Sequence, residues 1–331
     1  MPKVLIVPRE VAKFRDRFCG PLEAAGLEVV VLPPGEANLP TESELLEALH
    51  GVEAVIAGSE PYQRRLFAAH PQLRVIARNG VGYDSIDVAA ATAAGVVVTI
   101  APGTNQGSVA EHTFALILGL TRHIPSRHAA LAAGGWNRLL SRPIRGQTLG
   151  LAGLGRIGRA VATRAVAFEM RVLAYDPRPD TAFCSAYGIG LVSFEQLLAE
   201  SDFLSLHLPL SPETRHIINR ETLAKMKPGA VLVNTSRGGL VCEADLVEAL
   251  RSGRLAGAAL DVFEEEPTPA DNPLRTLPNV ILTPHAAGVD EQSLHDMASS
   301  AAEAIACLRR GEWPGEKVVN PEVRAAFRWK W

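Results

Sequence analysis

The chain contains few cysteines and few lysines. Its four cysteines, spread over 331 residues, match the spacing of neither a disulfide framework nor a zinc site, so we expect reduced thiols and no bound metal. Lysine and arginine together number 33, of which only six are lysine, and the formal net charge is −3. A chain without a basic excess is not expected to bind nucleic acid or an anionic membrane surface. The arginine-rich background also weakens any single arginine as evidence for a site.

Long hydrophobic runs are missing as well. No apolar stretch reaches the roughly 20 residues that span a bilayer. Met1 to Lys3 lead directly into an expected strand, with no room for a signal sequence. We therefore expect no membrane partner and a cytoplasmic location. The hydrophobic content of 47% is typical of a globular protein, and 331 residues suggest two domains.

The most informative feature of the sequence is a glycine-rich turn in the middle of the chain. Gly153, Gly155 and Gly158 follow a short apolar strand with the spacing G-x-G-x-x-G and open a helix, and a second strand ends at Asp176. The first glycine allows a tight turn, the second lets a pyrophosphate approach the backbone, and the third lets the helix pack on the strand. A terminal acid can bind ribose hydroxyls. Although a glycine turn without a ligand is the alternative, the combination predicts a bound dinucleotide.

Apolar strands alternate with amphipathic helical patterns in two series. The expected strands are 3–7, 28–32, 53–57, 73–78 and 96–100 in the first series, and 149–152, 171–175, 202–207, 230–234, 256–260 and 280–283 in the second. The expected helices include 11–25, 41–50, 62–69, 84–94, 107–122 and 290–310. This alternation predicts an α/β fold with parallel sheets and crossover helices.

The helix expected over 290–310 has no strand of its own to follow, so we expect it to return to the first domain. The fold would then consist of two doubly wound domains. An inserted Rossmann domain, 101–285, would bind the dinucleotide, and a discontinuous flavodoxin-like domain, 1–100 with 286–331, would bind the substrate. The tail over 327–331 carries aromatic residues that look exposed.

Three charged or titratable residues follow three successive strands of the second series. Arg237, Glu266 and His285 come after the strands at 230–234, 256–260 and 280–283. Because ligands of open α/β sheets bind beyond the carboxyl ends of the strands, these side chains are candidates for one site. An arginine can clamp a carboxylate, a histidine can give a proton to a carbonyl, and a carboxylate can orient that histidine. Taken singly, Arg237 could equally be a surface ion-pair partner, Glu266 a solvated loop residue and His285 a turn residue.

These motifs, with Pro209-Leu-Ser-Pro-Glu-Thr214, Arg78 to Asp87 and Ser108-Val-Ala-Glu-His112, closely resemble the D-isomer-specific 2-hydroxyacid dehydrogenase family over about residues 50 to 290. The resemblance implies that Arg237 binds substrate and that Glu266 is the partner of the acid/base His285. It also implies that backbone amides around Val81 and Gly82 hold the substrate carboxylate, and Arg78 is a further substrate-binding candidate.

The resemblance implies NAD as the cofactor, with Arg156 and Ile157 at the pyrophosphate and Asp261 at the carboxamide. The full set of expected cofactor-binding residues is Gly153, Gly155, Arg156, Ile157, Gly158, Asp176, Pro209, Thr214, Thr235, Asp261 and Gly288. Asp176 favours NAD over NADP because its charge repels a 2′-phosphate. The family is usually dimeric through its cofactor domains, so we expect a homodimer in which the segment around 107–146, including Trp136, reaches across.

The substrate stays open between two members of this family. The segment from Arg78 to Asp84 resembles enzymes acting on phosphoglycerate and those reducing hydroxypyruvate or glyoxylate, and we rank a phosphoglycerate-like substrate first. Glu60, however, stands where phosphoglycerate enzymes often have a phosphate-contacting arginine. Glu266 argues against a formate dehydrogenase. A third hypothesis, of another class, is an NAD-sensing binding protein similar to the family's corepressors.

Overall fold

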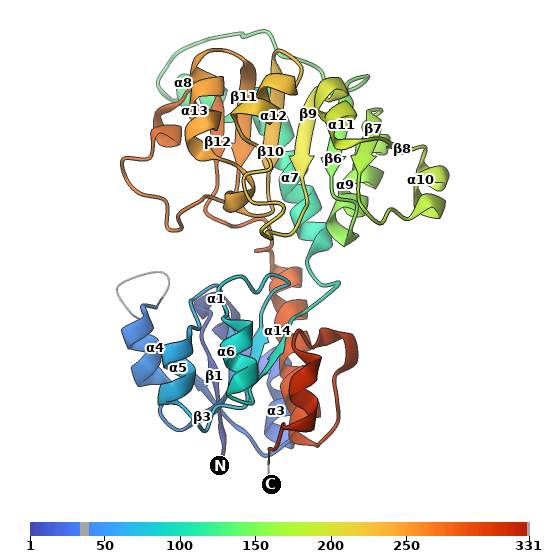
Figure 1. The fold of residues 1–331 in the computed structure, drawn as a ribbon. Helices are drawn as coiled ribbons and strands as arrows, with labels where there is room; N and C mark the ends of the chain where they lie inside the picture. Colours follow the sequence, from blue (N-terminus) through green and yellow to red (C-terminus); the bar gives the residue numbers. More distant parts are fainter. Residues whose placement is uncertain (34–39, 330–331) are drawn as a thin grey trace. The chain divides into compact units, whose positions relative to one another are not determined.

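The computed structural model describes residues 1–33 and 40–329 and divides the chain into two compact units, each built on a parallel sheet (Figure 1). The first unit comprises Met1–Asn105 and Val289–Trp331, and the second comprises Gln106–Gly288. The chain thus leaves the first unit and returns to it a few residues later than the boundaries expected after residues 100 and 285.

The sheet of the first unit has the strand order β2-β1-β3-β4-β5, with every pair parallel. Its strands are β1 (Lys3–Ile6), β2 (Glu28–Val31), β3 (Val52–Ala57), β4 (Val75–Arg78) and β5 (Val97–Thr99). Its helices are α1 (Arg9–Ala12), α2 (Arg15–Phe18), α3 (Gly20–Ala24), α4 (Glu42–Ala48), α5 (Arg64–Ala69), α6 (Val88–Ala93), α14 (Glu291–Arg309) and the short 3₁₀ helices η3 (Gly315–Lys317) and η4 (Pro321–Ala325). This is the flavodoxin-like order, so the expected doubly wound sheet is confirmed.

The single helix expected over 11–25 is wrong, because three short helices occupy the segment. Pro21 has no amide hydrogen to continue a helix, and it lies in the first turn of α3 instead. Leu22 of that helix and Phe18 of α2 are still buried, so the apolar pattern predicts the core-facing residues although the helix is interrupted.

Helix α14 packs on β3 and β4 of the first unit. It begins after Asp290, whose side chain accepts from the Ser293 amide, and ends before Gly311, which has φ +78°. The aromatic tail that follows is not exposed at Trp329, which is 9% accessible, so that expectation is wrong there. The indole finds a partner because its Nε1 donates to Glu53 at 2.6 Å. Residues 330–331 lie outside the described part.

The second unit carries a seven-stranded parallel sheet in the order β12-β11-β10-β9-β6-β7-β8. Its strands are β6 (Thr148–Ala152), β7 (Arg171–Tyr175), β8 (Gly190–Leu191), β9 (Phe203–Leu206), β10 (Ala230–Asn234), β11 (Leu255–Leu260) and β12 (Val280–Leu282). Its helices are α7 (Gln106–Thr121), α8 (Ile124–Ala132), α9 (Arg156–Ala167), α10 (Thr181–Tyr187), α11 (Phe194–Glu200), α12 (Arg220–Lys225), α13 (Glu243–Arg251), η1 (Gly238–Leu240) and η2 (Pro273–Thr276). The order reverses beside β6, as in the Rossmann fold. The six expected strands are confirmed; β8, with two residues, is too short to show a pattern in the sequence.

Candidate active site

The glycine turn between β6 and α9 needs two of its glycines for packing alone. A Cβ on Gly153 would lie 2.5 Å from the carbonyl oxygen of His207, and one on Gly158 would lie 2.3 Å from that of Gly153. Gly153 also has φ +99°. Gly155 differs, since a Cβ there would meet no protein atom within 4 Å. The protein itself therefore does not require glycine at position 155, and the space beside it suits the close approach of a ligand.

Asp176 follows β7 and faces the same turn. Its Oδ2 accepts from the Leu154 amide at 2.7 Å and its Oδ1 from the Arg178 amide at 2.8 Å. The two backbone donors fix the carboxylate beside the start of α9. Arg156 and Ile157 form the first turn of that helix, where amide hydrogens lack an intrahelical acceptor and attract anions. The geometry fits a dinucleotide whose ribose meets the acid and whose pyrophosphate meets the helix.

The remaining cofactor candidates lie at the ends of other strands of this sheet. The Thr214 hydroxyl donates to the Pro209 carbonyl oxygen at 2.7 Å and closes the loop after β9. Thr235 follows β10 and is buried, and its hydroxyl lies 3.1 Å from that of Thr113 on α7. Gly288 is the last residue of the unit. Thr235 thus packs against a helix, a contact that the sequence does not suggest.

His285 and Glu266 meet although 19 positions separate them. The imidazole Nδ1 lies 2.6 Å from Glu266 Oε2, while Glu266 Oε1 accepts from the Phe263 amide at 2.9 Å. About 40% of the His285 side chain and 30% of the Glu266 side chain are accessible. The acid fixes the imidazole through one nitrogen, which leaves the other for exchange with a ligand.

His285 has a left-handed backbone, with φ 52°. That conformation is uncommon outside glycine and requires support from its surroundings. The His285 amide donates to the Asp261 carbonyl oxygen at 2.8 Å. The Asp261 carboxylate accepts from the amides of Ala286 and Ala287, each at 2.8 Å. Asp261 therefore holds both sides of the turn that carries the histidine.

Asp261 itself is completely buried. Burial alone would raise its pKa, but hydrogen bonds from His112, Thr283 and the amides of Ala286 and Ala287 outweigh this and lower the pKa below the usual value. The carboxylate consequently stays ionised and keeps its acceptor role near neutral pH.

Arg237 lies in the loop after β10, the strand beside β11. Its guanidinium Nη1 donates to the Ser236 carbonyl oxygen at 2.6 Å, and its own carbonyl oxygen accepts from Asn234 Nδ2 at 2.8 Å. A Cβ on the next residue, Gly238, would lie 1.9 Å from the Phe263 carbonyl carbon. The loop bearing Arg237 and the loop leading to Glu266 are therefore in direct backbone contact.

In the first unit, Arg78 is 8% accessible and braces two loops. Its Nε donates to the Gly82 carbonyl oxygen at 2.6 Å, and its Nη1 donates to the carbonyl oxygens of Ala57 and Gly58. The segment that contains Val81 and Gly82 is held in this way at the end of β4. The contact of these three residues with a substrate stays a prediction.

Glu60 is also buried in this unit, at 1% accessibility. Its Oε1 accepts from the Tyr62 hydroxyl at 2.7 Å and from the Gly58 amide at 2.8 Å. Burial and the neighbouring carboxylate raise the pKa of Tyr62 well above its usual value. The acid predicted to replace a phosphate-binding arginine is thus already engaged by its own loop.

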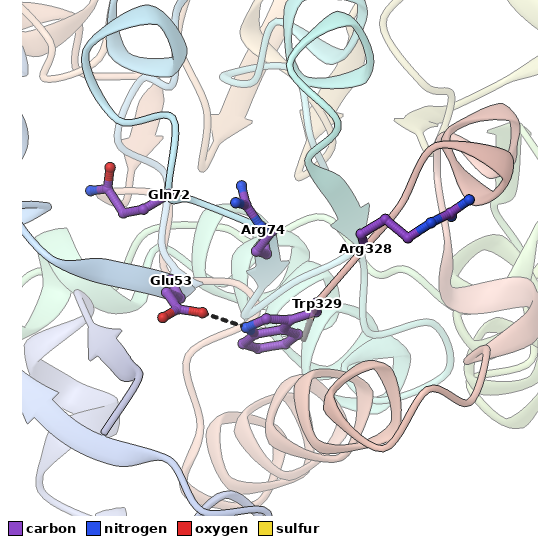
Figure 2. A pocket seen from close by; sticks show the side chains of 5 residues that line it. All are labelled: Glu53, Gln72, Arg74, Arg328 and Trp329. Carbon is purple, nitrogen blue, oxygen red and sulfur yellow. Dashed lines mark hydrogen bonds between the residues drawn. The ribbon is translucent and has the colours of Figure 1, made fainter. Parts of the chain in front are cut away.

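A hollow of different character lies near the start of β3 in the first unit (Figure 2). It is lined by Glu53, Gln72, Arg74, Arg328 and Trp329. Glu53 is near the amino end of β3 and Arg74 precedes β4, so the hollow faces the edge opposite to the strand ends where ligands of such sheets bind. None of the predicted site residues lines it.

Three residues of α7 receive no role from the sequence, although two of them belong to the motif from Ser108 to His112. Ser108 Oγ donates to the Ala287 carbonyl oxygen at 2.8 Å, and His112 Nε2 lies 2.9 Å from Thr283 Oγ1. Thr113 contacts Thr235. For Ser108 and His112, the helical spacing is the available signal, because residues four positions apart share a face.

Over residues 1–33 and 40–329, no group of acids, histidines and cysteines is arranged to hold a metal ion. Within the same ranges, no helix is both long and apolar enough to cross a membrane.

Comparison with known proteins identifies relatives along most of the chain. The family model described as "D-isomer specific 2-hydroxyacid dehydrogenase, NAD binding domain" matches residues 114–287. A glyoxylate reductase of Korarchaeum cryptofilum is 42% identical over 86% of this chain and 87% of its own length. A D-3-phosphoglycerate dehydrogenase of Methanocaldococcus jannaschii is 45% identical over 85% of this chain, but the chain spans only 54% of that protein.

Solved structures agree with this. The TT0316 protein from Thermus thermophilus has a TM-score of 0.86 and 39% identity, covering 96% of this chain and 99% of that one. A glyoxylate reductase from Paecilomyes thermophila has a TM-score of 0.83 and 32% identity, covering 97% and 99%. With these matches and its NAD-binding unit, the chain belongs to the D-isomer-specific 2-hydroxyacid dehydrogenase family of NAD-dependent oxidoreductases.

Proposed function

We propose that His285 is the acid/base residue of this dehydrogenase, that Glu266 orients it, and that Arg237 binds the carboxylate or carbonyl oxygen of a 2-oxo acid. The observation that carries this proposal is the 2.6 Å contact between His285 Nδ1 and Glu266 Oε2 in the NAD-binding unit. The neighbouring loop, in backbone contact with theirs, bears Arg237. The proposed site thus combines His285, a proton donor for the carbonyl oxygen, with Arg237, a cation that can bind the anionic substrate.

The chemistry requires one hydride and one proton. Reduced NAD, when bound, would supply the hydride to the carbonyl carbon. His285 gives its proton to the carbonyl oxygen as negative charge develops there, and takes it back in the reverse reaction. Glu266 holds the imidazole in place through the 2.6 Å contact with its Nδ1. Arg237 fixes the oxygen atoms of the acid so that the carbonyl carbon is correctly oriented.

The cofactor contacts belong to the same proposal. Asp176 would hold the ribose hydroxyls, the amides of Gly155, Arg156 and Ile157 would hold the pyrophosphate, and Gly153 and Gly158 shape the turn. Pro209, Thr214, Thr235 and Gly288 would line the cofactor cleft. The resemblance also implies Asp261 at the carboxamide, but this residue is completely buried and its carboxylate already accepts from Thr283, Ala286 and Ala287, so we do not assign it a direct contact. Support comes from the orientation of Asp176 by two backbone amides and from the space beside Gly155.

The substrate is a short 2-hydroxy acid, with a D-3-phosphoglycerate-like compound as the first candidate. Relatives named D-3-phosphoglycerate dehydrogenase favour it. Reduction of glyoxylate or hydroxypyruvate is the second candidate. It is favoured by the similarity to the glyoxylate reductase of Korarchaeum cryptofilum, of which this chain spans 87%. It is also favoured by the buried Glu60, which stands where phosphoglycerate enzymes often have a phosphate-contacting arginine. Val81, Gly82 and Arg78 belong to the substrate side of the proposal.

A panel of acids tests this directly. Purified protein is mixed with NADH and glyoxylate, hydroxypyruvate, pyruvate or 3-phosphohydroxypyruvate, and the decrease of nicotinamide absorbance is followed. Turnover of the phosphorylated acid with the highest kcat/KM supports the first candidate, and preference for an unphosphorylated acid supports the second. Binding of NADH without reduction of any acid would instead support an NAD-sensing protein.

A homodimer in the cytoplasm completes the proposal. Several large apolar side chains between residues 124 and 140 are exposed, including Trp136 at 83% and Leu140 at 96%. Apolar side chains gathered on one segment are typical of a protein interface. The cysteines at 19, 184, 242 and 307 are unpaired, as in reducing compartments. Light scattering coupled to size exclusion should report a dimer, and Trp136→Arg with Leu140→Arg should yield monomers.

A further inference from the structure

Helix α7 contacts both loops that carry the candidate catalytic residues. Thr113 on this helix reaches Thr235, two residues before Arg237. His112, its neighbour, reaches Thr283, two residues before His285. The helix is therefore a common support behind the two loops, and its polar side chains are the means of attachment.

The hydrogen bonds of the Thr283 hydroxyl determine which ring nitrogen of His112 carries a hydrogen. The Thr283 hydroxyl lies 2.5 Å from Asp261 Oδ1, and the carboxylate, being ionised, can only accept. The single hydroxyl hydrogen of Thr283 is used in this bond. The 2.9 Å contact between Thr283 Oγ1 and His112 Nε2 must then have the imidazole as donor. His112 is thus protonated on Nε2, in a chain that runs from His112 through Thr283 to Asp261.

This chain ends on the carboxylate that holds the turn of His285. Asp261 receives the amides of Ala286 and Ala287, and its carbonyl oxygen receives that of His285. His112 Nε2 also lies 3.5 Å from Asp261 Oδ1. Since the backbone of His285 is left-handed, its position depends on these bonds rather than on local preference.

We propose that His112 is a positioning residue of the reaction, which acts on His285 through Thr283 and Asp261. The proposal rests on the assignment of His285 as the acid/base residue. Without the Nε2 donor, the Thr283 hydroxyl can rotate away from Asp261, and the turn loses one of the bonds that fix its histidine. We expect the loss of this donor to lower kcat, because a displacement of a catalytic group by about 1 Å can lower the rate about 100-fold.

His112→Leu removes the donor, and His112→Gln keeps an amide donor at a similar reach. We expect about a 10-fold lower kcat in the leucine variant, and recovery of most of this loss in the glutamine variant. The KM for the acid and the dissociation constant of NADH, measured by fluorescence, should change less than about 2-fold. Thr283→Val should lower kcat similarly, and the double variant should lose no more than either single variant, because the two residues act in one chain.

Thr121→Val is the matched control for Thr283→Val. Thr121 is also buried, at 6% accessibility, but its hydroxyl donates only within α7, to the Ile117 carbonyl oxygen. This variant should keep the wild-type kcat. Melting temperatures of all variants show whether they are folded at the assay temperature.

The two proposals fail separately. If the wild type reduces no acid, the assignment of the reaction fails. If the wild type is active and folded His112→Leu retains its kcat, the positioning role is refuted. The proposal would also be contradicted if the double variant multiplied the losses in kcat of the two single variants. The same holds if His112→Gln had a kcat no higher than that of His112→Leu.

Discussion

Gly238→Ala should lower both the stability of the second unit and the catalytic activity. The added Cβ would lie 1.9 Å from both the carbonyl carbon and the carbonyl oxygen of Phe263, and 2.5 Å from the Glu264 amide nitrogen. Backbone atoms cannot rotate aside as a side chain can. To reach even 3.0 Å, the two loops must separate by about 1 Å. Such overpacking costs about 3 kcal/mol, which lowers the melting temperature of a unit of this size by roughly 6–12 °C.

The same separation moves the two sides of the candidate site apart. Arg237 directly precedes Gly238, and Glu266 binds the Phe263 amide at 2.9 Å. We therefore expect kcat/KM to fall about 100-fold at a temperature where the variant is still folded. Melting followed by circular dichroism and initial rates with NADH measure the two effects.

Gly107→Ala is the control, because a Cβ on that residue of α7 would meet no atom within 4 Å. Alanine favours a helix over glycine by up to about 1 kcal/mol, so its melting temperature should stay or rise. If Gly238→Ala melted within about 1 °C of the wild type with its rate intact, the close approach of the two loops would be refuted.

Further predictions concern four residues. His285→Gln should lower kcat about 100-fold or more with NADH affinity kept, and a wild-type rate would move the proton donor elsewhere. Glu266→Gln should lower kcat, because a neutral amide replaces the carboxylate that holds His285 Nδ1 at 2.6 Å, and an unchanged kcat would separate the pair. Asp176→Asn should raise the efficiency with NADPH relative to NADH about 10-fold, since a repulsive charge is removed; kinetics with both cofactors measure it. Because the pKa of Asp261 is lowered in the fold, its ionised form stabilises the protein above the usual aspartate range, and this stabilisation is lost as pH falls through the lowered pKa. The melting temperature of the wild type should therefore exceed that of Asp261→Asn near neutral pH, and the gap should shrink on acidification; a constant gap would contradict the hydrogen bonds assigned to this carboxylate.

Much of the fold could be predicted because parallel sheets give strong local signals. The strands at Arg171–Tyr175 and Ala230–Asn234 occur with the expected bounds, since each is an apolar run ended by turn residues. Helix α8 is absent from the expected elements because it begins after His123 in a left-handed conformation (φ 54°) and none of its residues is buried. Without a buried face, a helix has no apolar period to detect.

For the site, the order of strands predicts the meeting of Glu266 and His285, and the structure brings their side chains together. The side-chain direction of Thr235 and the bracing role of Arg78 could not be predicted. Both depend on partners distant in sequence, Thr113 and Gly58, and no local pattern encodes which carbonyl or hydroxyl will be nearby.

The path of the chain explains why α7 supports the turn that carries His285. The second unit begins at Gln106 and ends at Gly288, and the Ser108 hydroxyl joins these two ends by donating to the Ala287 carbonyl oxygen. His285 lies in the turn just before the exit, where no further strand of the unit follows to hold it. A sheet fixes residues within its strands, but a catalytic group on a terminal turn needs support from another element to stay within about 0.5 Å of its working geometry. Helix α7, at the entry, supplies that support through Ser108 and His112, which lie one helical turn apart. This accounts for polar residues on a helix face that is otherwise buried.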